Sequence, residues 1–261
     1  MEQSDRKLVL LIRETESSML VYNYLKDRVP IHAIIAEKGI SNFSMIRGRI
    51  RRIGFWKTAG QILFILLVNP VLELHSRKRK KEILASYGLK LDKIPETLIT
   101  RVHSVNSDEC RKILKALDPF IVLVNGTRII APQTLSCCNA SFINIHDGIT
   151  PIFRGVHGGY WALAKQRPDL FGTTIHFVDR GIDTGGIIEQ VFIQPGPKDN
   201  FVTYPYLQHA EAMPVVEKVL RQILNGNSIA IKEPLAKESG LYHHPTIFEW
   251  FRFLKYTRIF F

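Results

Sequence analysis

Short apolar runs are the feature that most restricts the folds open to this chain. They occupy residues 8–12, 31–35 and 120–124, and each is flanked by charged, proline or turn-forming residues. Runs of this length are typical of strands that are buried on both faces of a parallel sheet. Residues 14–27, between the first two runs, have helical composition, which gives a strand–helix–strand unit. We therefore predict an α/β fold.

The alternation of strand and helix patterns continues along the chain. Further strands are predicted over 98–102, 142–146, 173–178 and 187–193, and further helices over 107–117, 132–135, 158–165 and 210–224. The first of these helices opens with Ser107-Asp108-Glu109, a capping pattern. Together these elements predict a Rossmann-like open sheet that is mostly parallel and flanked by helices.

The turn after the first predicted strand excludes one large class of α/β proteins. Nicotinamide and flavin dinucleotides bind where a G-x-G-x-x-G turn lets the pyrophosphate approach the backbone. Here the turn reads Arg13-Glu14-Thr15-Glu16 and contains no glycine. We therefore expect no NAD or FAD.

Most of the positive charge lies in one segment, within residues 38–92, where the strand–helix alternation is interrupted. The net charge of the chain is +11, and residues 47–82 hold ten basic and two acidic residues, a net +8. Between the basic clusters lies the apolar stretch 61–74, which is broken by Pro70. It is shorter than the about 20 residues that span a bilayer. Such a basic patch indicates a polyanionic neighbour.

This insertion has three interpretations. The first is an amphipathic or buried helical hairpin that covers one edge of the sheet. In the second, residues 47–81 make a peripheral membrane contact, with apolar side chains in the bilayer interface and Lys and Arg on lipid headgroups. The third is contact with nucleic acid.

Cysteine usage and the first residues bear on the compartment. The three cysteines, Cys110, Cys137 and Cys138, allow no disulfide framework and no C-x-x-C pair, and the adjacent two are interpreted as packing. Glu2 and Asp5 precede the first apolar run, which does not resemble a signal peptide. We expect a cytoplasmic protein, peripheral to a membrane if the second interpretation of the insertion holds.

Three predicted loops place chemically capable side chains at the carboxyl ends of strands, where open α/β sheets bind ligands. Asn144 and His146 are two residues apart, so both side chains lie on one face of their strand. Asp183 lies in a glycine-rich turn 37 residues after His146, and Thr127-Arg128 follow the strand at 120–124. Together an amide, an imidazole and a carboxylate suit attack on a carbonyl. Asn144 would supply an oxyanion donor and His146 would exchange the proton, while Asp183 would orient and charge the histidine.

Each of these residues also has a purely structural interpretation. A histidine at a strand end is commonly a buried polar residue with satisfied hydrogen bonds, and asparagines at strand ends are common turn residues. A metal site would need His146 with His157, or His243 with His244, and neither pair has a third ligand at zinc-site spacing. We therefore predict no metal.

Three ordered stretches carry a resemblance to a known family. FINIHDGITPIFRGVHGGYWAL at 142–163 resembles the N-x-H, Pro, R-G and W-A-L signature of the N10-formyltetrahydrofolate-dependent formyltransferases, which include sugar N-formyltransferases. GTTIHFVDRGIDTGGIIEQ at 172–190 resembles the aspartate loop of that family. DPFIVLVNGTRIIAPQTL at 118–135 resembles its folate-holding strand and turn. The resemblance extends over about 8–190, apart from 38–92, and is strongest over 118–190.

The resemblance implies a transferase of one-carbon metabolism whose formyl donor is N10-formyltetrahydrofolate. Residues 1–205 would form the formyltransferase catalytic domain, with a basic helical insertion at about 38–92, and 206–261 a short C-terminal helical extension. Asn144, His146 and Asp183 match the catalytic positions. The positions that match the cofactor-binding segments are Thr127, Arg128, Ile129, Val178, Asp179, Gly181 and Ile182.

The resemblance does not specify the acceptor. Members that act on initiator tRNA carry a C-terminal barrel domain, whereas a helix is predicted here at 210–224, so a nucleic-acid partner is not expected. The insertion is not part of the minimal enzyme that formylates glycinamide ribonucleotide. We therefore expect a small-molecule primary amine, an amino group of a nucleotide-linked amino sugar, whose phosphates the arginines of the insertion would bind. Asp147-Gly148-Ile149-Thr150 replaces the more common Ser-Leu-Leu, on the acceptor side.

Several alternatives stay open. A formyltetrahydrofolate hydrolase would use the same triad with water as the nucleophile, and glycinamide ribonucleotide or methionyl-tRNA are other acceptors. A non-catalytic protein could retain the fold, and a homodimer is a further possibility for the assembly. An aromatic run near the C-terminus is interpreted as a docking helix, with a membrane or partner contact as the alternative: Phe248, Trp250, Phe251, Phe253, Tyr256, Phe260 and Phe261.

Overall fold

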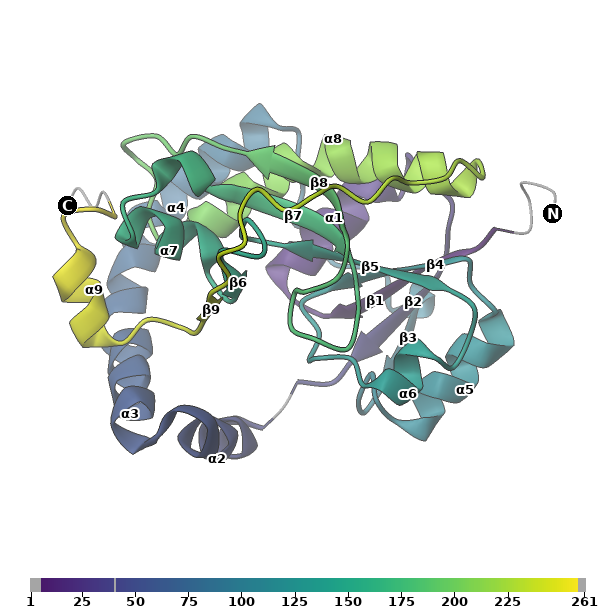
Figure 1. The fold of residues 1–261 in the computed structure, drawn as a ribbon, viewed down its shortest axis with the longest axis horizontal. Helices are drawn as coiled ribbons and strands as arrows, with labels where there is room; N and C mark the ends of the chain where they lie inside the picture. Colours follow the sequence, from purple (N-terminus) through teal and green to yellow (C-terminus); the bar gives the residue numbers. More distant parts are fainter. Residues whose placement is uncertain (1–5, 40, 258–261) are drawn as a thin grey trace.

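The three apolar runs form adjacent central strands of a seven-stranded sheet in the computed structural model, which describes residues 6–39 and 41–257 (Figure 1). In chain order its strands are β1 (Leu8–Arg13), β2 (Ile31–Glu37), β3 (Ile99–Val102), β4 (Ile121–Asn125), β5 (Ser141–His146), β7 (Gly172–Phe177) and β8 (Ile187–Phe192). A separate short pair is formed by β6 (Arg154–Gly155) and β9 (Leu241–Tyr242).

Helices connect and cover these strands. They are α1 (Glu16–Leu25), α2 (Asn42–Ile53), α3 (Phe55–Leu63), α4 (Asn69–Ser86), α5 (Asp108–Leu117), α6 (Pro132–Leu135), α7 (Gly158–Ala164), α8 (Tyr204–Leu224) and α9 (Ile247–Phe253). A π-helical turn, η2 (Phe64–Val68), joins α3 to α4, and two short 3₁₀ turns are η3 (Glu96–Leu98) and η4 (Pro168–Leu170).

The sheet is parallel over its first five strands and antiparallel at one side. Its order is β3-β2-β1-β4-β5-β7-β8, and only the pairs β5–β7 and β7–β8 are antiparallel among the described strands. The prediction of a Rossmann-like, mostly parallel α/β sheet is therefore confirmed. Because β1, β4 and β5 run in the same direction, their last residues, Arg13, Asn125 and His146, lie along one edge of the sheet.

Alternate residues of the central strands supply two cores, one on each face. Leu8, Leu10 and Ile12 pack beneath α1 and α8, whereas Val9 and Leu11 pack with α5 and α6 on the opposite face. All five of these side chains are buried, because a strand covered by helices on both faces has no polar side. Figure 1 shows α8 along one face of the sheet and α5 with α6 on the other.

The predicted cap at Ser107 is confirmed, and Thr15 caps another helix in the same way. The Ser107 hydroxyl accepts a hydrogen bond of 3.2 Å from Cys110 N–H at the start of α5. Thr15 caps α1 by accepting from Ser18 N–H at 3.5 Å. A side-chain acceptor at the N-cap satisfies one of the N–H groups that a helix leaves unpaired at its start.

The insertion is not the predicted helical hairpin over a sheet edge. From Phe55 to Ser86 it is one long helical segment that packs chiefly against α8 and α9, and Pro70 does not reverse the chain. The π-turn before Pro70 explains this, since its wider ring accommodates a residue that has no N–H and would clash in a regular turn. The extra residue also keeps Phe64 and Leu72 on one buried side although they are eight positions apart.

The C-terminal region is closely joined to the rest. Helix α8 begins at Tyr204, so the predicted boundary at residue 205 lies within its first turn, and the helix packs on β7, β8 and α1. Downstream, β9 pairs with β6 and α9 buries Trp250. The division into 1–205 and 206–261 stays a prediction, and Phe260 and Phe261 lie outside the described residues.

Candidate active site

A cavity of about 810 Å³ opens at the carboxyl ends of β1, β4 and β5. Its volume lies within the range of about 300–1,000 Å³ that is usual for small-molecule sites. The sequence-predicted catalytic and cofactor-binding residues all line it: Thr127, Arg128, Ile129, Asn144, His146, Val178, Asp179, Gly181, Ile182 and Asp183. The fold therefore brings all these candidates into one space, although they come from three separate segments of the chain.

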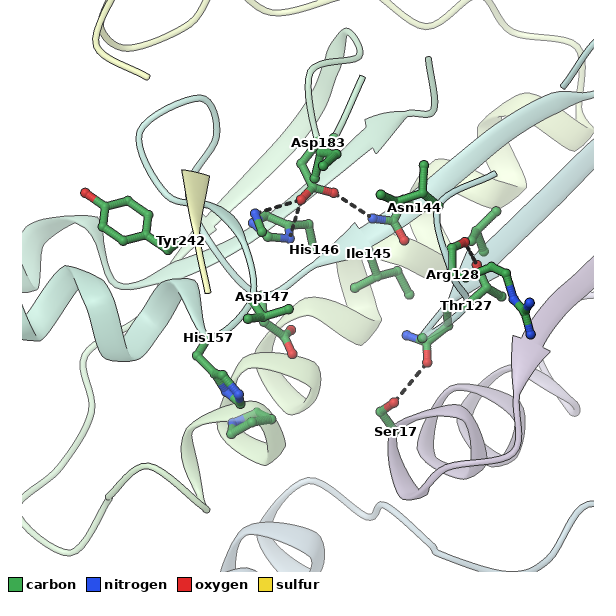
Figure 2. A pocket seen from close by; sticks show the side chains of 18 of the residues that line it. Ser17, Thr127, Arg128, Asn144, Ile145, His146, Asp147, His157, Asp183 and Tyr242 are labelled. Atoms are coloured by element: carbon green, nitrogen blue, oxygen red, sulfur yellow. Dashed lines mark hydrogen bonds and ion pairs between the residues drawn. The ribbon is translucent and has the colours of Figure 1, made fainter. Parts of the chain in front are cut away.

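Asp183 is the centre of the polar cluster in this cavity (Figure 2). His146 Nδ1 lies 3.5 Å from Asp183 Oδ2. The Asn144 amide donates from Nδ2 to Asp183 Oδ1 at 3.4 Å. The predicted amide and imidazole thus both contact the predicted carboxylate.

The loop that carries Asp183 is held by the R-G pair of the sequence motif. Asp183 has φ 51°, in the left-handed region, which aspartate tolerates better than most residues. Gly155 N–H donates to Asp183 Oδ2 at 2.9 Å, and the Arg154 guanidinium donates to the Ile182 carbonyl at 3.0 Å. A side chain at residue 155 would meet the Tyr242 carbonyl at 2.2 Å, so glycine is required for this approach.

The surroundings keep Asp183 ionised. Burial alone raises the pKa of this carboxyl group, but three favourable interactions oppose the effect. A hydrogen bond with His176, the charge of His146 and the Gly155 N–H together lower the pKa of Asp183 to about 2. The carboxylate therefore carries a full negative charge at neutral pH and can stabilise a proton on a neighbouring imidazole.

The ring of His146 is oriented by the backbone. Its Nε2 lies 2.7 Å from the Phe153 carbonyl oxygen, and because a carbonyl only accepts, Nε2 carries the proton of the neutral ring. Nδ1 faces the Asp183 carboxylate, which would stabilise a proton at that nitrogen. A buried ring with one nitrogen fixed in this way suits general acid–base chemistry.

His176 joins this cluster and was missed by the sequence reasoning. It stands opposite Asn144 in the antiparallel pairing of β5 with β7, and its Nε2 is 3.3 Å from Asn144 Nδ2 and 3.6 Å from Asp183 Oδ1. Its other nitrogen donates to the Phe177 carbonyl at 2.7 Å. The signal that could have found it is a histidine on the predicted strand 173–178, directly before the aspartate loop.

On the opposite side of the cavity, Glu37 fixes the loop that contains Thr127 and Arg128. Its buried carboxylate accepts from Arg128 N–H at 2.7 Å and from Arg128 Nε at 2.5 Å. Arg13 adds a contact of 3.1 Å to the same carboxylate. A charge buried in this way is stable only when it is paired and hydrogen-bonded, so Glu37 and the loop position each other.

Comparison with known proteins identifies the family. The model of the formyl transferase family matches residues 69–212, which is more than half of the chain. The chain belongs to the formyl transferase family. The resemblance seen in the sequence is therefore confirmed, and the match includes the second half of the insertion.

Individual members of the formyl transferase family are similar over parts of the chain. A methionyl-tRNA formyltransferase of Chlorobium chlorochromatii is 27% identical over 130 residues, which is 50% of this chain and 41% of that protein. The mitochondrial formyltetrahydrofolate deformylase 1 of Arabidopsis thaliana is 34% identical over 109 residues, 40% of this chain and 32% of that protein. The chain thus spans less than half the length of these curated relatives.

A solved structure shares the fold. The N-formyltransferase of Helicobacter canadensis, in complex with folinic acid and dTDP-3-aminofucose, superposes with a TM-score of 0.54 and 14% identity. The likeness covers 91% of this chain and 70% of that one. At this identity the likeness shows the fold of the family.

Asp147 belongs to the stretch that the sequence placed on the acceptor side, but it was not predicted as a site residue. It follows His146 and lines the cavity, and its Oδ1 is buried without a hydrogen-bond partner among the described residues. His209 Nδ1 lies 3.4 Å from this oxygen but donates to the Pro205 carbonyl at 2.9 Å. Burial raises the pKa of Asp147, against the opposing influence of His209 and His146.

The floor of the cavity continues from His209 to the end of β4. Asn125, a turn residue by sequence, is buried there, with its Nδ2 3.3 Å from His209 Nε2. Its amide oxygen accepts from the hydroxyls of Ser17 at 3.0 Å and Ser18 at 2.9 Å. These bonds fix the orientation of His209, so that the hydrogen-bonding capacity of Asp147 is left for a ligand.

Two further predictions concern the insertion and metals. Of the ten basic residues in 47–82, Arg52 alone is among the described residues that line the cavity.

His157 and His244 pack with ring centroids 4.9 Å apart, and burial lowers the pKa of His157 to about 3 and that of His244 to about 4. Within residues 6–39 and 41–257, His, Cys, Asp and Glu side chains form no group of three or more suited to a metal ion.

Proposed function

We propose that this chain transfers a formyl group from N10-formyltetrahydrofolate to a primary amine of a small molecule, an amino group of a nucleotide-linked amino sugar. The observation that carries the proposal is the pairing of two carboxylates across His146. Asp183 contacts the histidine on one side, whereas Asp147 lines the cavity and has one oxygen that is buried without a hydrogen-bond partner in the described structure. A carboxylate with one oxygen buried and unpaired is costly unless a cationic group pairs with it.

The residues of the cavity fit a reduced folate. The loops 127–130 and 178–182 face the cavity with apolar side chains, Ile129, Ile130, Val178 and Ile182, together with main-chain polar groups. A pterin ring is flat and carries amide and amine groups on its edge, so apolar walls with main-chain donors and acceptors suit it. Glu37 holds the first loop through Arg128, which preorganises that wall.

The donor supplies an activated formyl carbon, to which the acceptor amine adds while the bond to the folate nitrogen breaks. Asn144 Nδ2 would donate to the formyl oxygen as negative charge develops there. Its present contacts, 3.3 Å to His176 and 3.4 Å to Asp183, are longer than an optimal hydrogen bond and can be exchanged for a stronger acceptor. His146 Nδ1 would take the proton that the amine loses on addition and return it to the folate nitrogen as that bond breaks, and Asp183 would stabilise the imidazolium in between.

Two residues would recognise the acceptor. Asp147 would bind its ammonium group beside His146 and accept the proton that this nitrogen must lose before it can attack the formyl carbon, which places the nitrogen next to the reacting centre. Arg52 lines the same cavity, makes no ion pair with another described residue and would bind a phosphate of the nucleotide. The relative from Helicobacter canadensis was solved with folinic acid and an amino sugar on a nucleotide, which supports both choices of ligand.

The test follows tetrahydrofolate release with and without candidate amines. Release should depend on an amine, and Asp147→Asn should raise the KM for the amine by about tenfold or more while leaving the KM for the donor nearly unchanged. Asp169→Asn is the matched control, since Asp169 is an exposed aspartate paired with Arg167. Unchanged amine kinetics in Asp147→Asn would contradict the acceptor role.

A hydrolase is the second candidate, because the relative from Arabidopsis thaliana is a formyltetrahydrofolate deformylase. A hydrolase would release formate at the same rate with or without an amine, and its activity would still require His146. Amine-independent turnover that is lost in His146→Ala would therefore replace the transferase by the hydrolase. If His146→Ala retained both formyl transfer and formate release, the assignment of the site would be overturned.

A further inference from the structure

Helix α2 has an amphipathic sequence, but the protein covers its apolar side only in part: Ile46 and Ile53 are half-buried, whereas Phe43 and Ile50 are exposed. Phe43, Ile46, Ile50 and Ile53 are spaced as one side of a helix. No side chain of residues 43–53 is buried, and Phe43 is 76% exposed. Short helices in water owe most of their stability to the packing of such a face. The outer part of the apolar side of α2, with Phe43 and Ile50, therefore lacks the partner that its sequence requires.

The long helix 55–86 has the same property on its outer side. Its inner side is fixed to the protein by Phe64, which packs on Phe201 and Trp250 with ring centroids 4.9 Å and 5.2 Å apart. Gln61 also donates to the His244 carbonyl at 2.6 Å, and Arg79 pairs with Asp199. The opposite side carries large exposed apolar residues: Trp56, Leu63, Leu66, Leu67, Val71 and Leu74.

These surfaces and α9 lie together. Only Gly54 separates α2 from α3, α3 packs on α9, and Figure 1 shows the three helices grouped at one end of the molecule. We call the exposed apolar residues of these helices the apolar face. Its members are Phe43, Ile50, Phe55, Trp56, Leu63, Leu66, Leu67, Val71, Leu74, Phe248 and Phe251. A group of this size is unusual on a soluble protein and indicates an interaction surface.

Unpaired positive charge borders the apolar face at both ends. On the α2 side lie Arg47, Arg51 and Lys57, and on the α4 side Arg77, Lys78 and Lys81 follow the apolar residues along the helix. None of these six forms an ion pair with another described residue, in contrast to Arg79 and Lys80. Apolar side chains bordered by long basic ones match the acyl and headgroup layers of an anionic bilayer.

We propose that the apolar face docks the protein onto an anionic lipid bilayer, with α2 and the outer side of the helix 55–86 lying in the interface. By length and composition this helix is also apolar enough to cross a membrane. Its inner side, however, is held in the protein core by Phe64 and Leu72 and by the pairing of Arg79 with Asp199. A spanning helix would have to give up these contacts, whereas a helix lying in the interface keeps them.

Vesicle binding tests the proposal with the full chain. In sedimentation it should bind vesicles of equal parts phosphatidylcholine and phosphatidylglycerol, bind phosphatidylcholine alone more weakly, and lose binding as salt rises. Trp56 is 83% exposed, whereas Trp161 and Trp250 are 5% and 3% exposed. The fluorescence emission of the protein should therefore shift to shorter wavelength with the mixed vesicles, and Trp56→Phe should abolish the shift.

A pair of matched double variants separates the apolar face from exposed apolar residues in general. Leu66→Ser with Leu67→Ser changes side chains that are 64% and 58% exposed, and binding to the mixed vesicles should fall by about tenfold or more. Ile231→Ser with Leu235→Ser changes side chains elsewhere that are 63% and 57% exposed, and binding should persist. Both pairs are exposed, so folding, checked by thermal unfolding, should be retained.

Three results would overturn the proposal. One is the absence of both sedimentation and the fluorescence shift with mixed vesicles. Another is an equal loss of binding in the two double variants. The third is self-association in vesicle-free buffer that the Leu66→Ser, Leu67→Ser variant abolishes, since a second copy of the chain would then be the occupant of the apolar face.

Discussion

Replacing Asp183 by asparagine removes one charge from the centre of the cavity with little change in shape. The asparagine side-chain oxygen can still accept from Gly155 N–H, but the negative charge beside His146 and His176 is lost. Two consequences follow, one for stability and one for catalysis, and both can be given a magnitude.

The stability effect comes from the lowered pKa of Asp183. A drop from 3.8 to about 2 corresponds, at about 1.4 kcal/mol for each pKa unit, to roughly 2 to 3 kcal/mol of stability at neutral pH. Because the pKa is lowered in the folded state, this contribution is full above the unfolded value and is lost as the pH falls through about 4 to 2. About half should remain near pH 3. For a chain of 261 residues, the full effect is about 5 °C in Tm.

The catalytic effect comes from the proton that His146 must hold. Without the carboxylate the imidazolium loses its stabilising partner, and kcat should fall by about 10²–10³, equal to about 2.7–4 kcal/mol. Thermal unfolding of both proteins between pH 7 and pH 3, together with turnover at saturating substrate, measures the two effects. A Tm difference that does not narrow toward low pH would refute the electrostatic explanation, and an unchanged kcat would refute the role of Asp183.

Two further predictions concern residues that support the site. Glu37→Gln leaves Arg13 and Arg128 without their shared carboxylate, so we expect a loss of about 3 kcal/mol in unfolding free energy and a larger rise in the KM for the formyl donor than fall in kcat; donor kinetics that are unchanged would show that the loop is held otherwise. Gly148→Ala would place a Cβ 2.4 Å from the Phe153 carbonyl oxygen and 2.7 Å from His146 Nε2, so kcat should fall at least about tenfold. Gly48→Ala, where the new Cβ meets nothing within 4 Å, should leave kcat unchanged.

Much of the fold was predictable because the signals are local. A strand buried on both faces needs a continuous apolar run, and Ser107 caps α5 through an N–H only three residues away. The location of the site followed from the same patterns, because parallel strands end at the same edge of a sheet. Residues 144, 146 and 183 could thus be placed in one crevice before any contact was known, and the structure places Asn144 3.4 Å and His146 3.5 Å from the Asp183 carboxylate.

The remaining features depend on contacts between distant parts of the chain. His176 reaches Asn144 only because β7 turns antiparallel to β5, and the Asp147 carboxylate is left unpartnered because residues of α8 and α1 satisfy His209 and Asn125. The course of the insertion likewise was decided by packing, since Phe64, Leu72 and Trp250 hold one long helix where Pro70 suggested a reversal. The sequence by itself determined which segments become strands and where a ligand would bind, because periodicity and strand direction are local properties. Only the tertiary structure decided which polar groups are paired, which remain free for a substrate and which apolar residues stay uncovered, because those outcomes depend on neighbours up to about two hundred residues apart.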